Sequence, residues 1–158
     1  MMKTMTGGRP TIVGNIWYGA ITGLVYGFCY IILYLITTSL VPGSHNPLNT
    51  IPDSLLLSFV FQIVGSIPVG IIFGLIVFFL VTRAKMDRNF TKYVIVALVF
   101  QGAFFILDFT SAMNNVGFDL FVDGPIMFIN ELVLANVLAL VFFHTEKHFI
   151  DVKEHSKE

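Results

Sequence analysis

The chain has 158 residues and a net charge of −1, with 56% hydrophobic and only 12% charged residues. An ordinary soluble domain carries about twice that charged fraction. The polar segments are about a dozen residues long, too short to bury a core, which excludes a soluble domain. The single cysteine excludes a disulfide or a cysteine-based metal site within one chain.

Four long apolar stretches predict an all-α integral membrane protein, since about 20 apolar residues are enough to cross a bilayer as a helix. The expected spans are residues 12–40, 54–82, 93–113 and 124–144. Residues 145–158 are expected to form a polar cytoplasmic tail. Because the apolar runs are continuous rather than alternating, a transmembrane β-barrel is excluded. The prediction is a single membrane domain built as a four-helix antiparallel transmembrane bundle.

The Lys and Arg residues predict the orientation of these spans. All nine precede the first span, lie between the second and third spans, or follow the fourth. The two remaining connections, 44–53 and 114–123, contain none. Cytoplasmic loops carry an excess of Lys and Arg, so both termini are predicted to be cytoplasmic, in a plasma or inner membrane. The basic segment 83–92 is explained as a determinant of topology, and no nucleic-acid module accompanies it.

The first two spans carry small residues at four-residue steps. They are Gly19, Gly23 and Gly27 in the first span, and Ser66, Gly70 and Gly74 in the second. This spacing lets helix backbones approach closely, which predicts a packing interface either within the chain or between protomers. Pro68, in the middle of the second span, removes a backbone hydrogen bond and predicts a kink or hinge.

The third and fourth spans each contain one acidic residue, Asp108 and Glu131, very roughly 7–10 Å below the predicted outer boundary. A carboxylate at such depth costs about 2.5–3.5 kcal/mol and normally faces the protein interior. The same two spans supply further polar candidates, which are Gln101, Ser111, Asn130 and Asn136. Three interpretations remain open: the acids are protonated, they bind a cation with these oxygen atoms, or a basic group of a partner protein neutralises them.

Paired carboxylates also suit aspartyl hydrolysis, in which one acid activates a water molecule and the other holds a proton. Four spans with acids near the outer ends of the last two are similar in outline to lipoprotein signal peptidases. Residues 106–109, Ile-Leu-Asp-Phe, look like one fragment of that family's aspartate motif. Glu131 departs from it, because the family has an aspartate there, preceded by an Asn-x-Ala pattern. An intramembrane aspartyl-type hydrolase is therefore a remote alternative.

His144 and His148 stand four residues apart, a spacing that lets two imidazoles reach one metal ion. The simpler interpretation is a polar helix end, where such residues suit the helix dipole. We treat both as weak metal candidates, and no metal or other cofactor is predicted.

The sequence therefore predicts a non-enzymatic, small multi-pass protein that associates with other chains through its glycine-rich helix faces. Its role would be that of a subunit or assembly element of a larger membrane complex. The expected partners are the lipid bilayer and either other membrane subunits or further copies of the chain. The alternative is a small oligomeric transporter or channel, coupled to a cation or proton through Asp108 and Glu131.

Overall fold

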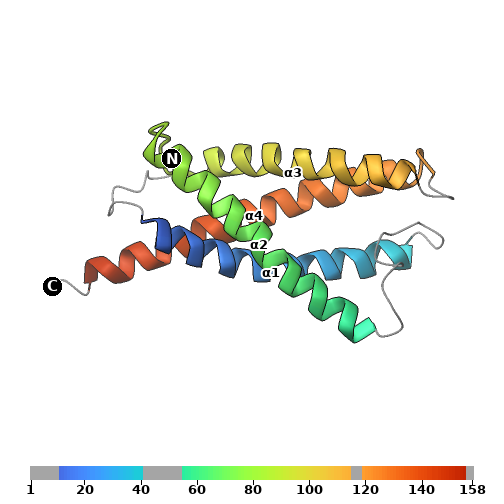
Figure 1. Cartoon of the computed structure of the whole chain (residues 1–158), viewed down its shortest axis with the longest axis horizontal. Helices are drawn as coiled ribbons and strands as arrows, with labels where there is room; N and C mark the ends of the chain where they lie inside the picture. Colours follow the sequence, from blue (N-terminus) through green and yellow to red (C-terminus); the bar gives the residue numbers. More distant parts are fainter. Residues whose placement is uncertain (1–10, 41–54, 115–118, 156–158) are drawn as a thin grey trace.

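The structure, a computed structural model, describes residues 11–40, 55–114 and 119–155. Those residues form four α-helices and no strand (Figure 1). The helices are α1 (Ile12–Leu40), α2 (Leu55–Thr82), α3 (Phe90–Met113) and α4 (Asp123–His155). Each is long and apolar enough to cross a membrane, which confirms the predicted all-helical, four-span class. The first residue of the second predicted span and the last three residues of the tail lie outside the described residues.

The largest differences from the predicted spans are at the start of α3 and at the end of α4. Helix α3 begins at Phe90 because the extended Asn89 caps it, its side chain accepting the Lys92 backbone N–H at 2.9 Å. Helix α4 continues to His155, so the segment from residue 145 to that point is helical. A local hydrogen bond also stabilises the start of α4, because the Asp123 carboxylate accepts a hydrogen bond of 2.9 Å from the backbone N–H of Asp119.

Helices α1 and α2 touch through their backbones. A Cβ atom added to Gly19 would lie 2.5 Å from the carbonyl oxygen of Gly70, and one added to Gly27 would lie 3.1 Å from the Cβ of Ser66. A Cβ atom added to Gly23 would also meet the backbone oxygen of Ser66. Contacts nearer the C-terminal end of α1 involve residues nearer the N-terminal end of α2. Small residues make this approach possible, because any larger side chain would separate the two backbones.

The structure places all six small residues of the predicted packing set between α1 and α2 of one chain. Gly74 completes the set, since its Cβ position lies 2.5 Å from the carbonyl oxygen of Asn15. Pro68 lies on the exposed side of α2, and the helix continues through it.

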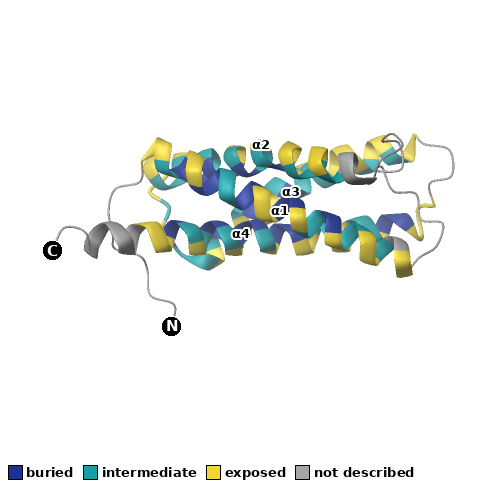
Figure 2. Cartoon of the chain, turned by 90° about the horizontal axis from the view of Figure 1, so that it is seen from below, coloured by how far each residue is buried: buried dark blue, intermediate teal, exposed yellow. Residues whose placement is uncertain are grey.

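The core lies where α4 meets the other helices, and the buried residues line the inward faces (Figure 2). Phe142 occupies the centre of this core. Its ring lies edge-on to the rings of Phe73 and Tyr93, with centroid distances of 5.4 Å and 5.8 Å. Fully buried alanines, such as Ala97 and Ala139, let the neighbouring helices approach these rings. The resulting layer is apolar and close-packed, and its α2 and α3 residues lie in the halves of those helices nearer the connection formed by residues 83–89.

Helix α3 is the least covered of the four. Only 11% of its most apolar 18-residue window is buried, against 28% to 33% in the other three helices. It packs mainly on α4. Helices α2 and α3 approach at the end where residues 83–89 connect them, which we call the basic end, and diverge towards the opposite end (Figure 1).

Candidate functional site

A hydrogen-bonded polar chain joins three helices near the middle of α1 and α3. The side-chain nitrogen of Gln101 in α3 donates to Glu131 Oε2 of α4 at 2.7 Å and to Tyr26 Oη of α1 at 2.6 Å. Gln101 is only 1% exposed. Its carboxamide oxygen is buried and has no hydrogen-bond partner among the described residues. The structure thus brings two predicted site residues together and adds Tyr26 to them.

Asp108 lies close enough to these hydrogen-bonded side chains for its charge to act on Glu131. It also acts on Tyr30, one turn beyond Tyr26 on α1. The two acids differ in their surroundings. Glu131 is half-buried and accepts a hydrogen bond from Gln101, whereas Asp108 is exposed on α3. Within the described part of the chain, the Asp108 carboxylate has no hydrogen bond or ion pair.

The other predicted polar residues are more dispersed. Asn130 joins α4 to α1, its side-chain nitrogen donating to Thr37 Oγ1 at 3.4 Å. Asn136 is exposed, and its side chain donates to the carbonyl oxygen of Leu132 on its own helix at 2.8 Å. Asn136 follows Glu131 by five residues, a rotation of about 140° around the helix axis, so it lies on another face of α4. Ser111 is exposed, one turn beyond Asp108.

A second polar cluster lies at the basic end. Tyr93 Oη donates to Glu146 Oε2 at 2.5 Å, and Arg88 Nε lies 3.5 Å from Glu146 Oε1. The side chains of Arg88 and Glu146 are only 7% and 2% exposed. The ion pair between Arg88 and Glu146 therefore joins the connection between α2 and α3 to α4.

Arg88 lies in the basic segment 83–92, which the sequence explains as a determinant of topology, and Glu146 is not among the predicted site residues. One signal could have identified Glu146, because Leu138, Phe142 and Glu146 follow one another at four-residue steps. That spacing extends the apolar face of the fourth span and places Glu146 on its buried side.

The two polar clusters are separated by the apolar layer. Glu131 and Glu146 are fifteen residues apart on α4, about 22 Å along the helix. The fully buried α4 residues between them are Leu134, Ala135, Leu138, Ala139 and Phe142. At this level of α1, the buried Thr22 hydroxyl donates to the carbonyl oxygen of Tyr18 on its own helix at 2.7 Å. The hydrogen bonds of the described residues therefore do not link the clusters.

His144 and His148 are exposed on α4, beside the rings of Phe143 and Phe149 respectively. In the described ranges, no three His, Cys, Asp or Glu side chains are grouped so that they could hold a metal ion.

Comparisons of the chain with protein-family models, with curated proteins and with solved structures give no match.

Proposed function

We propose that the chain is a non-enzymatic subunit or assembly element of a larger membrane complex, and that its partner packs on α3. The observation that carries this proposal is the exposed carboxylate of Asp108 within an apolar helix long enough to span a membrane. An acid inside a bilayer almost always faces protein or a water-filled cavity rather than lipid. A partner helix that supplies a basic or hydrogen-bonding side chain would meet that requirement.

Helix α3 is also the least buried of the four helices, which favours it as the surface on which a partner packs. Leu107, adjacent to Asp108 on α3, is 66% exposed, and Ser111, one turn beyond Asp108, is exposed as well. The glycine faces are already used between α1 and α2, so the proposal assigns partner binding to α3 instead of to these faces. We further propose an antiparallel bundle in a plasma or inner membrane, with both termini cytoplasmic, because this orientation accounts for the positions of all nine Lys and Arg.

Photo-crosslinking from α3 tests the partner. With a photoreactive amino acid at Leu107 or Ser111, the exposed residues that flank Asp108, we expect one defined second protein to be captured in native membranes. The matched control is the same label at Phe79 of α2, a position with a similar exposure of 60%. Capture of lipid alone, or only of further copies of the chain, would refute the subunit proposal.

Asp108→Asn should reduce recovery of the captured protein about thirtyfold or more in mild detergent. Truncating one member of a buried charge pair at an interface costs about 2–5 kcal/mol, and 2 kcal/mol corresponds to that factor. Asp119→Asn, which removes an exposed acid outside the apolar helices, should leave recovery unchanged. Equal recovery from both variants would exclude Asp108 from the contact.

A cation- or proton-coupled transporter is the second candidate, favoured by the buried, unpaired oxygen of Gln101 beside Glu131. Oxygen atoms of this kind are what a bound cation requires. The apolar layer argues against a path through a single chain. The hydrolase has less support, because Glu131 is held inside the bundle while Asp108 is exposed.

Proteoliposomes separate this candidate from the subunit proposal. We expect vesicles containing the wild-type chain or Glu131→Gln to show the same Na⁺, K⁺ and proton flux as empty vesicles. Glu131→Gln should also leave partner recovery unchanged, since Glu131 is engaged within the bundle. A flux through the wild-type chain that Glu131→Gln abolishes would instead establish the transporter.

A further inference from the structure

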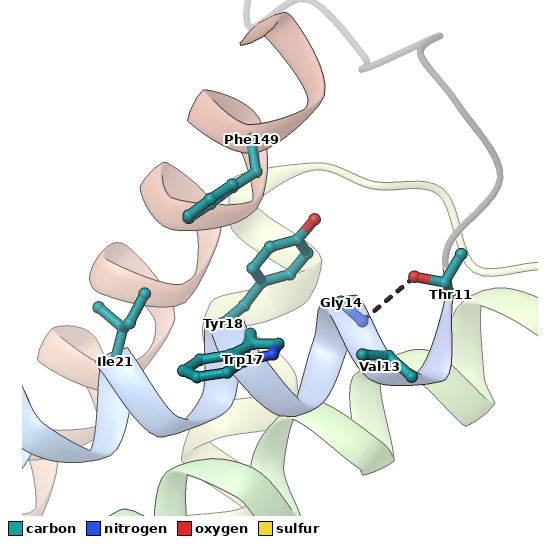
Figure 3. A pocket seen from close by; sticks show the side chains of 7 residues that line it. All are labelled: Thr11, Val13, Gly14, Trp17, Tyr18, Ile21 and Phe149. Atoms are coloured by element: carbon teal, nitrogen blue, oxygen red, sulfur yellow. Dashed lines mark hydrogen bonds between the residues drawn. The ribbon is translucent and has the colours of Figure 1, made fainter. Parts of the chain in front are cut away.

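A cavity of about 420 Å³ lies beside the start of α1 (Figure 3). Its walls are largely aromatic, formed by Trp17 and Tyr18 of α1 and by Phe149 of α4. The rings of Tyr18 and Phe149 stack with their centroids 5.4 Å apart. The space depends on Gly14, because a Cβ atom there would lie 2.9 Å from Thr11 Oγ1 and 3.2 Å from Tyr18 Oη.

The cavity lies at the boundary of the membrane-spanning segments. The first candidate span begins at Ile12, and the fourth ends at Phe149. The body of the cavity is apolar, while Thr11 and Tyr18 contribute hydroxyl groups near its polar end (Figure 3). A site with an apolar body and a polar rim at this depth suits an amphiphile with one chain inserted and its headgroup at the boundary.

The charges at this end of the bundle favour an anionic headgroup. Exposed cations on the 83–89 connection and on α4 include Arg83, Lys85 and Lys147. They belong to the same end as the cavity, because Arg88 pairs with Glu146 and Phe149 follows three residues later on α4. One Lys or Arg near an anionic membrane surface strengthens binding about fivefold.

We propose that the cavity holds one acyl chain of an anionic phospholipid, with the phosphate at the level of the Thr11 and Tyr18 hydroxyls. This inference is independent of the partner proposed for α3, since the cavity involves only α1, the residue before it, and α4. It gives Trp17, which is 65% exposed, a place against a bound lipid chain.

Trp17 also reports on the site, because it is the only tryptophan in the chain. The full-length protein in neutral detergent is titrated with phosphatidylglycerol or phosphatidylcholine carrying dibrominated acyl chains, which quench tryptophan fluorescence. Half-maximal quenching should require about fivefold less phosphatidylglycerol than phosphatidylcholine. Raising the salt concentration from 0.05 to 0.5 M should remove this preference by screening the headgroup charge.

Variants locate the quenching lipid. Gly14→Leu fills the cavity and should raise the phosphatidylglycerol concentration for half-maximal quenching about fivefold or more, removing the preference over phosphatidylcholine. Gly65→Leu, at a glycine with nothing within 4 Å of its Cβ position, should behave like the wild type. Phe149→Ala removes one wall and should weaken quenching even if Gly14→Leu folds poorly.

Two results would overturn the proposal. Identical curves for the two lipids, unchanged in Gly14→Leu and Phe149→Ala, would mean that Trp17 contacts only bulk lipid and detergent. Selective quenching that arises only after deletion of residues 2–8 would show that this segment, rather than a phospholipid, occupies the cavity in the full chain.

Discussion

Gly70→Ala should destabilise the folded chain by about 3 kcal/mol, the upper part of the usual range for overpacking. The added methyl group would meet the carbonyl oxygen of Gly19 and the backbone nitrogen and Cα of Gly23. Backbone atoms cannot rotate aside as a flexible side chain can, so α1 and α2 must separate along their whole contact. Gly23→Leu, on the facing helix, should go further and prevent recovery of folded protein. Thermal unfolding in detergent, followed by circular dichroism, measures the loss.

Gly65→Ala is the matched control, since it adds the same methyl group to the same helix five residues earlier, where nothing lies within 4 Å. Replacing glycine by alanine within a helix is normally favourable by about 0.5–1 kcal/mol. Gly65→Ala should therefore be at least as stable as the wild type. If Gly70→Ala also kept wild-type stability, the backbone contact between α1 and α2 would be wrong.

Arg88→Met should lower the free energy of unfolding by about 3–5 kcal/mol, because it leaves the buried charge of Glu146 without its ion-pair partner. Tyr93 would still donate its hydrogen bond, but a neutral hydroxyl does not replace a guanidinium. The double variant Arg88→Met/Glu146→Met should recover most of the loss, since apolar side chains of similar volume can replace a buried ion pair at little cost. Denaturant titration of the three variants gives the coupling between the two sites.

Lys92→Met provides the control for this experiment. It breaks the 2.7 Å ion pair with Asp87, whose side chains are 39% and 66% exposed. An exposed pair contributes at most about 1 kcal/mol, so stability should scarcely change. A double variant as unstable as Arg88→Met alone would mean that the cost arises from lost packing and not from an unpaired charge.

The four helices could be predicted because their apolar runs are long enough to span a bilayer. The glycine steps also predicted close packing, but they could not distinguish contact within one chain from contact between chains. Gly19 and Gly70 meet inside the chain because α2 folds back onto α1, and this depends on how the helices cross. The orientation of the bundle in the membrane stays a prediction.

The candidate site was less accessible to such reasoning. Gln101 and Glu131 were both singled out, but residue types alone do not tell that one amide group reaches both Glu131 and Tyr26. Asp108 and Glu131 look equivalent in sequence, yet one is exposed and the other engaged inside. Burial of a given acid depends on helix rotation about its axis, which a nearly uniform apolar stretch leaves undetermined.

The position of Glu146 has a consequence for how the protein is made. Chains are synthesised from the N-terminus, and the earliest segments can pack before the later ones emerge. Helices α1 and α2 contain the whole glycine contact, so they can pair while the second half is still being translated. The Arg88–Glu146 pair forms only when the last turns of α4 have been added. A chain interrupted before residue 146 would lack the carboxylate that pairs with Arg88 in the finished protein, so this contact between α4 and the 83–89 connection is among the last to form.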